Sequence, residues 1–272
     1  MKKTFFITLL FASYSLSAQE LYVYTEPASN MPAKSVSTKL SANYGQRRFN
    51  SVQHRYTPEV MLGINKNWMV HLAGTFSNMH TKDIKWESVY TYAKYRFLSK
   101  DDVHKHFRMA AFAEATYSRN NVIYDEIMLQ GDMSGVQGGL IATQLVNKLA
   151  VSATTSYVQY LKTEKNPHHF SPFDKAMNYT LSAGYLVLPR EYKSYDQLNF
   201  NIYTELLAQR IFESKRYYID IAPAIQFLIK SNSKINLGYR KQLKGTMYRG
   251  FTESFLFSFE HTFFNALRKR KR

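Results

Sequence analysis

The sequence contains no cysteine. This absence excludes a disulfide framework, and it excludes the lipidated N-terminal cysteine of a lipoprotein. After Gln19 the sequence also lacks any uninterrupted run of roughly 18 apolar residues, the length that a transmembrane helix needs. If the chain is integral to a membrane, it must therefore be a closed β-barrel, because lipid leaves no other way to satisfy the backbone polar groups.

Local catalytic motifs are missing as well. The sequence has no G-x-S-x-G nucleophile elbow and no H-E-x-x-H zinc motif. Four glycines cluster at 131, 135, 138 and 139, but no helix is predicted after them, so we interpret them as strand bulges or close contacts. We predict no catalytic residue and no cofactor. A lipid-modifying barrel enzyme needs no local motif, however, and would place a Ser or Asp beside a His, such as His261, at one membrane interface.

Acidic residues are few, with 20 against 36 basic residues and a formal charge of +16. In a cytosolic protein this excess would indicate a nucleic-acid partner. The N-terminus is instead typical of a secretory leader, since Lys2 and Lys3 precede an apolar stretch over residues 5–12 and small residues lead up to Gln19. We therefore predict a signal peptide over 1–18, cleaved before Gln19, and no nucleic-acid partner.

Loss of the leader leaves 34 basic and 20 acidic residues, a charge of +14 (34 minus 20). In the outer membrane of a Gram-negative cell, such a charge would meet lipopolysaccharide phosphates and anionic solutes. The alternative is that Lys and Arg decorate the rims of a barrel and extend their charged ends into water. The run of five basic residues over 268–272 fits either a contact with lipid headgroups or a solvated tail.

What the sequence contains is a repeated pattern of alternating apolar and polar side chains in twelve segments. This pattern predicts an all-β fold, a closed antiparallel transmembrane β-barrel of about 12 strands over residues 35–264. Tyrosines near many segment ends predict interfacial aromatic rings (Tyr44, Tyr56, Tyr90, Tyr117, Tyr179, Tyr217, Tyr239). The predicted strands are Val36–Tyr44, Tyr56–Ile64, Trp68–Phe76, Lys85–Leu98, Phe107–Tyr117, Val136–Val146, Leu149–Leu161, Met177–Leu188, Leu198–Ile211, Tyr217–Ile229, Ile235–Leu243 and Phe251–Phe263.

An even strand number places both ends of the barrel chain on the periplasmic side. Residues 19–34 then form a periplasmic lead-in or a small plug, and 265–272 a basic tail. Short polar connections at 65–67, 147–148 and 231–233 fall on the periplasmic side, and the longest, at 119–133 and 163–175, fall outside. The connection 189–197 is long for a periplasmic turn.

The polar face of each strand is expected to line the lumen. The lumen and pore-lining candidates are Glu59, His71, Lys94, Arg96, Arg108, Glu114, Glu205, Asp220, Arg240 and Glu260. Positive and negative charges are nearly balanced in this set, so we expect a network of ion pairs, because burying a charge without a partner would cost several kcal/mol. A twelve-stranded barrel is intermediate in width, so its lumen can be plugged or narrowly conducting.

A dense polar cluster at one predicted periplasmic turn is a candidate metal site. It consists of Asp101, Asp102, His104 and His106, and the two histidines share a strand face. Imidazoles and carboxylates together can bind a divalent transition metal. The alternative is a solvated turn that carries two incidental histidines.

The junction Ser17-Ala18-Gln19, the strand rhythm and the aromatic stretch from Phe255 to Phe264 together resemble the small outer-membrane β-barrel proteins of Bacteroidota. The resemblance implies assembly by the barrel-assembly machinery, through an internal signal, since eight residues follow Phe264. We expect a porin-like, non-enzymatic channel or transporter for small solutes or ions. The alternatives are a non-conducting barrel that binds lipopolysaccharide, metal or a partner protein, and an outer-membrane lipid-modifying enzyme. The oligomeric state stays open.

Overall fold

The computed structural model describes residues 22–46, 52–103, 105–120, 123–161, 173–189, 196–212 and 214–268. These residues form twelve strands, and every predicted segment overlaps one of them. The strands are β1 (Ser35–Gln46), β2 (Val52–Gly63), β3 (Trp68–Ser77), β4 (Lys85–Asp102), β5 (Lys105–Ser118), β6 (Gly135–Val146), β7 (Leu149–Tyr160), β8 (Lys175–Leu188), β9 (Asn199–Ile211), β10 (Tyr217–Ile229), β11 (Ser233–Gly245) and β12 (Glu253–Phe263).

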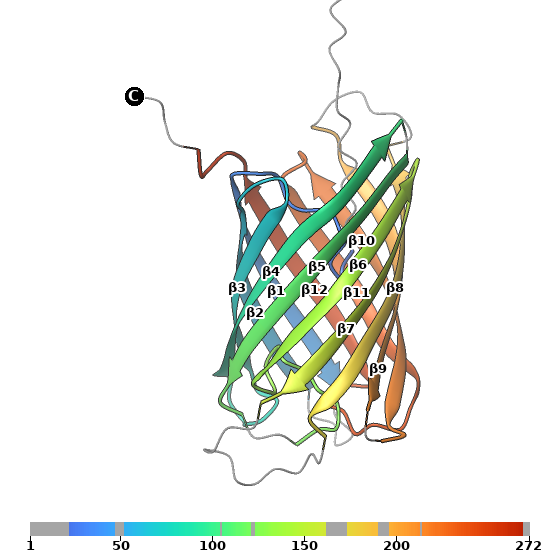
Figure 1. The fold of residues 1–272 in the computed structure, drawn as a ribbon. Coiled ribbons are helices and arrows are strands. Elements are labelled where there is room, and N and C mark those ends of the chain that lie inside the picture. The colour runs from blue at the N-terminus through green and yellow to red at the C-terminus, as the bar shows by residue number, and fades with distance from the viewer. Residues whose placement is uncertain are drawn as a thin grey trace, which may run out of the picture.

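The strands form one closed antiparallel barrel, as the sequence predicts (Figure 1). Each strand pairs with its neighbours in the chain, and β12 returns to pair with β1, from Val36 opposite Phe263 to Gly45 opposite Ser254. Closure leaves no strand edge with unpaired backbone groups, which is the condition for crossing lipid. Within the described residues, no helix is long and apolar enough to cross a membrane, a finding that concerns helices alone.

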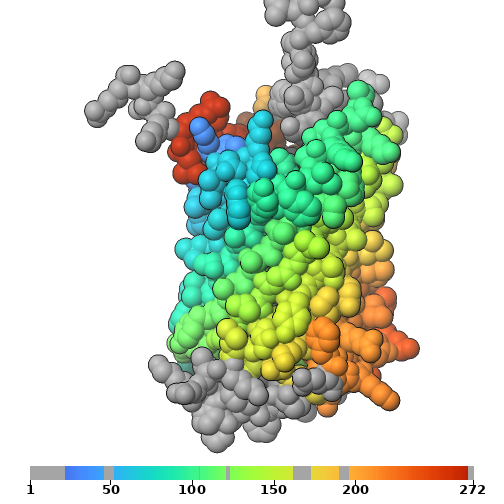
Figure 2. Space-filling model, in the orientation of Figure 1, coloured from blue at the N-terminus to red at the C-terminus, as the bar shows by residue number. Residues whose placement is uncertain are grey.

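The two faces of the wall differ sharply, and the outer one is apolar. In β12 the outward Phe255, Phe257 and Phe259 are 63%, 44% and 43% exposed, whereas the inward Ser254 and Ser258 are buried. The alternation of the sequence thus places its apolar face outside and its polar face inside, the reverse of a soluble barrel. On the face seen in Figure 2, side chains of neighbouring strands close the wall. An apolar outer band and a polar interior are the arrangement of a membrane barrel.

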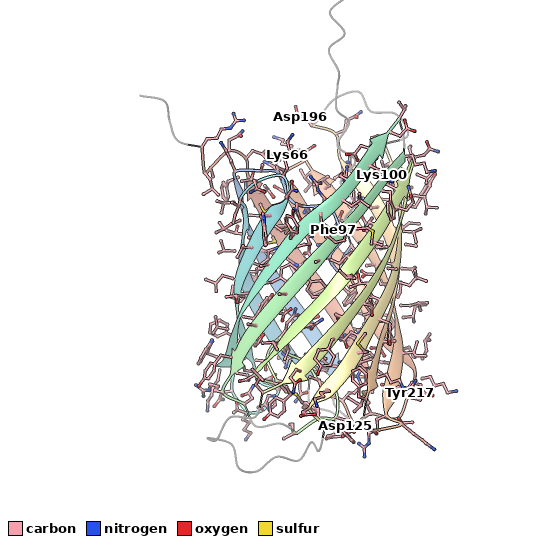
Figure 3. The ribbon with its side chains drawn as sticks, viewed as in Figure 1. Lys66, Phe97, Lys100, Asp125, Asp196 and Tyr217 are labelled. Carbon is pink, nitrogen blue, oxygen red and sulfur yellow. The ribbon has the colours of Figure 1, made fainter. Side chains whose placement is uncertain are left out.

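Two ends of the barrel can be told apart by their connections. Lys66, Lys100 and Asp196 lie at the end where β1 begins and β12 ends, and Asp125 and Tyr217 lie at the opposite end (Figure 3). Tight turns at Asn147 and at Lys230 use positive φ angles, 52° and 49°. The longer connection that joins β5 to β6 lies at the opposite end, as expected for the extracellular side.

The prediction that Tyr90 lies in the aromatic girdle is wrong. Tyr117 and Tyr179 do face outward, with half of each side chain exposed, but Tyr90 is 5% exposed and points into the lumen. The cause is a β-bulge where β4 pairs with β3, since Phe76 lies opposite Trp86 and Thr75 opposite Ser88. The extra residue shifts the alternation, so that Trp86 faces outward while Tyr90 faces inward.

Candidate functional site

The N-terminal segment, residues Tyr22 to Lys34, lies inside the barrel and is held by the wall. The Glu205 carboxylate of β9 is fully buried and accepts hydrogen bonds from the backbone N–H groups of Val23, at 2.9 Å, and Tyr24, at 2.8 Å. It also accepts a hydrogen bond from Thr25 Oγ1 at 2.6 Å. A buried carboxylate needs such donors, so Glu205, predicted as a lumen residue, anchors one side of this segment.

Lys94 of β4 anchors the other side of the N-terminal segment. Its ammonium is fully buried and donates to the carbonyl oxygens of Pro27 at 2.7 Å and Ser29 at 2.9 Å, and it lies 3.1 Å from Glu26 Oε2. Arg108 of β5 adds a hydrogen bond to Ser29 Oγ at 2.8 Å. Burial alone would raise the pKa of Glu26, but the nearby cations, above all Lys94, lower it to about 2. The segment therefore crosses the lumen between two charged anchors.

The connection between β5 and β6 folds into the barrel from the opposite end, and Arg249 holds it there. The Arg249 guanidinium contacts both carboxylate oxygens of Glu126, at 2.9 and 3.0 Å, and both of Asp220 in β10, at 2.8 and 2.9 Å. The Gln209 side chain exchanges two 2.9 Å hydrogen bonds with the backbone of Ile127. Bidentate pairs of this kind fix position as well as charge.

A second ion pair, between Arg55 of β2 and Asp132, holds the far part of this connection. His80 Nε2 lies 3.0 Å from the same Asp132 carboxylate. Gly131 has a φ of +128°, and a Cβ there would lie 2.9 Å from the Arg55 guanidinium carbon, so glycine permits the approach. Burial would raise the pKa of Asp132 and of Glu126, but the Arg55 and Arg249 guanidiniums outweigh it and hold both pKa values below their ordinary range.

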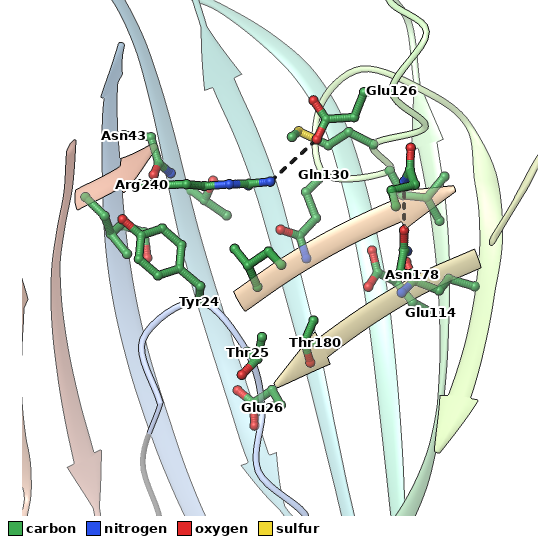
Figure 4. A pocket seen from close by; sticks show the side chains of 18 of the residues that line it. Tyr24, Thr25, Glu26, Asn43, Glu114, Glu126, Gln130, Asn178, Thr180 and Arg240 are labelled. Carbon is green, nitrogen blue, oxygen red and sulfur yellow. Dashed lines mark hydrogen bonds and ion pairs between the residues drawn. The ribbon is translucent and has the colours of Figure 1, made fainter. Parts of the chain in front are cut away.

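A chamber of about 390 Å³ lies between these two inward segments. Figure 4 shows Glu126 on one side of it, Thr25 and Glu26 on the other, and Glu114, Gln130, Asn178 and Thr180 between them. Five carboxylates and four cationic side chains line it (Glu26, Glu59, Glu114, Glu126, Asp132; Lys39, Arg55, Arg240, Arg249). Although the whole chain is strongly basic, the described lining of the chamber has one acidic side chain more than it has Lys and Arg side chains.

The acidic side chain without a basic partner in this lining is Glu114. Its side chain is 7% exposed, and in the described part of the chain no Lys or Arg forms an ion pair with it. Its hydrogen bonds come from neutral groups, Thr116 Oγ1 at 3.5 Å and the side chain of Gln130. The other carboxylates that line the chamber each have a cationic partner. Glu114 is thus the carboxyl group of the chamber that a positive or hydrogen-bond-donating solute could contact without breaking an ion pair of the described residues.

The other predicted lumen residues also have side chains on the inner side of the wall. Glu59 lies 2.7 Å from His71 Nδ1 and 3.6 Å from Lys39 Nζ, and Glu260 lies 2.9 Å from Lys234 Nζ. Arg240 contacts Asp220 at 2.6 Å through Nε. Arg96 is half-buried, and the pairing of β4 with β5 shifts register directly after it, between Arg96 and Leu98. Some predicted lumen residues therefore contact the N-terminal segment, others line the chamber, and the rest lie near the two ends of the barrel.

The predicted metal site is only partly described. Asp101 and His106 are register partners, 2.8 Å apart, but Arg108 and Ser99 also contact the Asp101 carboxylate, at 2.9 and 3.0 Å. The Asp102 carboxylate accepts a hydrogen bond from the backbone of Val103, and His104 lies outside the described residues. Over the ranges that the structure describes, no three metal-ligating side chains converge. The metal site stays a prediction that depends on His104.

His261 has the neighbour that a lipid-modifying enzyme would require. Its Nδ1 lies 2.8 Å from Ser233 Oγ on the outer wall, at the end of the barrel where β1 begins and β12 ends, and its ring packs against Phe263. The same hydroxyl lies 3.1 Å from Asn232 Oδ1. No acidic side chain in the described ranges forms an ion pair with His261. The pair therefore supplies a nucleophile and a base but no acidic group to orient the base.

The sequence analysis missed several functional residues. Alternation within β1 and β2 would have identified Lys39 and Arg55, because each shares the face of a neighbouring predicted lumen residue. No periodicity marks Glu26, Glu126, Asp132 or Arg249, which lie in irregular segments. For these four, the only available signal was a charged residue in a connection, which ordinarily indicates a solvated loop.

No protein-family model and no curated protein matches the sequence. Solved structures do match its fold. The KdgM porin superposes with a TM-score of 0.52 at 12% identity, over 84% of this chain and 99% of the porin. An outer-membrane channel from Pseudomonas putida F1 gives 0.56 at 10% identity, over 89% and 100%. The NanC porin gives 0.50 at 13%, over 83% and 98%. This chain therefore has the fold of outer-membrane β-barrel channels.

Proposed function

We propose that this protein is a non-enzymatic outer-membrane channel or transporter for small solutes, held closed by its N-terminal segment and by the connection between β5 and β6. The observation that carries the proposal is the polar chamber between these two segments, inside a wall whose outer face is apolar. A wholly structural barrel of this width would have no need of a polar interior compartment. The fold of the similar porins and channels supports this function without specifying a solute.

The chamber favours neutral or cationic polar solutes over anions. Every basic group that lines it has an acidic partner, whereas Glu114 has none among the described residues. An anion would have to displace a carboxylate from a guanidinium, while a cation or a hydroxyl-rich solute can contact Glu114 and the amides of Gln130 and Asn178. A low local dielectric makes this difference larger than it would be in water.

Single-channel conductance in a planar bilayer tests the proposal. The refolded protein is compared with a variant that lacks residues 22–33, and the heat-dependent shift of the folded barrel on a gel verifies folding of both. We expect rare or small steps from the intact protein and larger, frequent steps from the deletion variant. Reversal potentials in a KCl gradient should show cation preference, weakened by Glu114→Gln. A folded but silent deletion variant that also carries Arg249→Ala, which loosens the β5–β6 connection, would contradict the channel.

The Ser233–His261 pair makes lipid hydrolysis the second candidate. Phospholipase and deacylase activity of the refolded protein, measured beside Ser233→Ala, tests it. Turnover that disappears in Ser233→Ala would overturn the non-enzymatic function, and turnover that is unchanged would be attributed to a contaminant.

A further inference from the structure

The outer wall is hollowed at the extracellular end of β8, β9 and β10. The hollow has a volume of about 430 Å³ and lies on the opposite side of the wall from the chamber. Its floor follows from the strand register, because Tyr179 lies opposite Ala208, and Ala208 lies opposite Ile219. The small methyl group of Ala208 therefore lies between the larger side chains of Tyr179 and Ile219 and forms the floor of the hollow. The lining residues are Tyr179, Ala208, Gln209, Arg210, Lys215, Tyr217, Tyr218 and Ile219.

Three cationic side chains surround this hollow. Arg210 and Lys215 line it and are exposed, and the exposed Lys244 is the register partner of Ile219. None of the three forms an ion pair with another residue of the described ranges. Neighbouring cations do form such pairs, since Lys241 lies 2.9 Å from Glu253, and Arg216 contacts Asp125. Within the part of the chain that the structure describes, the hollow thus concentrates positive charge without an acidic partner, which predicts an anionic ligand.

The surroundings of the hollow are those of a membrane interface. Tyr179 and Tyr217 face outward there, and Tyr217 marks the end of the barrel in Figure 3. One step farther from that end, the outward side chains are Leu181 and Leu206, 50% and 38% exposed. Tyrosine rings prefer the headgroup level and leucines the hydrocarbon. A ligand that fits both parts has an anionic head and an alkyl chain.

We propose that this hollow binds lipopolysaccharide, with a phosphate of its lipid anchor between Arg210, Lys215 and Lys244 and an acyl chain lying over Ala208. The hollow is at the end of the barrel opposite the tight turns and the ends of the barrel chain, which is the extracellular leaflet, where this lipid resides. Three cations around one hollow match a headgroup with more than one phosphate better than the single phosphate of a phospholipid. The proposal requires that the protein lies in the outer membrane, but it does not require conduction. A negative conductance result would therefore leave the lipid-binding proposal unaffected.

The test measures binding of diphosphoryl lipid A to the refolded full-length protein in detergent, with native mass spectrometry and a thermophoresis titration. We expect the double variant Arg210→Gln/Lys215→Gln to bind at least about tenfold more weakly, since each basic residue at a membrane surface contributes on the order of 1 kcal/mol. Ala208→Phe, which fills the hollow from the lipid side, should weaken binding to a similar degree.

Matched control variants distinguish binding at this site from nonspecific binding of lipid to the barrel. Ala183→Phe adds the same ring at an outward alanine of the neighbouring strand β8, and Lys241→Gln removes a cation that already has an acidic partner. Both should bind like the unmodified protein. Equal binding by all variants would overturn the proposal. Phosphatidylglycerol that binds as tightly, with the same dependence on Arg210, Lys215 and Ala208, would identify a phospholipid as the occupant and would also overturn it. The gel shift on heating verifies that each variant is folded.

Discussion

The two segments that close the lumen are held by different chemistry. The N-terminal segment is gripped mainly through its backbone, because Glu205 contacts two of its N–H groups and Lys94 contacts two of its carbonyl oxygens. The β5–β6 connection is gripped mainly through its own charged side chains, Glu126 and Asp132, by Arg249 and Arg55. The N-terminal segment is therefore held by side chains of the wall, whatever its own side chains are. The β5–β6 connection is held only while its own carboxylates and the facing guanidiniums are both present.

This difference determines which substitutions and which ionisation changes release each segment. Backbone contacts survive most substitutions within the segment, and they are insensitive to the ionisation of its side chains. Ion pairs are lost when either partner is removed or neutralised. In the proposed channel, the β5–β6 connection would then be an adjustable gate that responds to its surroundings, and the N-terminal segment would be a fixed obstruction.

The largest effect is expected from Arg249→Ala. This change removes the guanidinium that contacts both buried carboxylates, Glu126 and Asp220, and leaves Arg240 as their one remaining cationic partner among the described residues. Breaking a buried ion pair costs about 3–5 kcal/mol, and the remaining contacts of Arg240 offset part of that loss. Hydrogen exchange of the backbone over residues 123–134 should become fast, while exchange in the N-terminal segment stays slow. Arg216→Ala, which removes a half-exposed partner of Asp125 at the rim, serves as the control. Equal protection in Arg249→Ala and the parent would refute a loop held by this residue.

Glu205→Ala should have the next largest effect, and on the other closure. It removes three hydrogen bonds to the N-terminal segment, and a hydrogen bond to a charged group contributes about 1.5–3 kcal/mol. Unitary conductance should rise, and limited proteolysis should cut the segment, while exchange over 123–134 is unchanged. Glu205→Gln keeps an acceptor oxygen and should be intermediate. Release of both segments by Glu205→Ala would show that the closures are coupled.

Acid should release the β5–β6 connection. The pKa values of Asp132 and Glu126 are held below their ordinary values, so their contribution to closure is complete above those ordinary values and is lost as the pH falls through the lowered ones. Exchange protection of residues 123–134 should therefore be constant from pH 8 to 5 and should decline below about pH 4. A decline centred near neutral pH would point to a different titrating group.

The smallest effect is expected from Glu26→Gln. Lys94 would keep the carbonyl oxygens of Pro27 and Ser29, so the segment should stay in place and proteolysis rates should change by less than about threefold, because the buried ammonium loses only the partly exposed Glu26 carboxylate and keeps two acceptors. Asp132→Asn is the comparable change in the other closure and should release it more. If the two substitutions had equal effects, the proposed contrast between backbone and side-chain anchoring would be wrong.

The wall could be predicted from the sequence because alternation in a barrel is a local property. Trp68 and Tyr217 begin strands where the pattern places them, and the inward faces of β9 and β10 follow directly from Glu205 and Asp220. The prediction failed at Tyr90, because one bulge reverses the alternation without a sequence marker. It offered residues 19–34 as a lead-in or a small plug, but it did not identify the second closure, since the pairing of Arg249 with Glu126 joins residues from irregular segments 123 positions apart.

The seam between β1 and β12 imposes an order of events on assembly. Ser37 and Thr262, which lie on the two sides of this seam and share a hydrogen bond, are 225 residues apart. The last strand must therefore be present before the first strand gains its second partner. Because β1 directly follows Lys34, the N-terminal segment is tethered at this seam from the outset. If β1 and β12 pair while the N-terminal segment lies between the strands, closure of the barrel encloses the segment in the lumen. The segment then needs no separate insertion step.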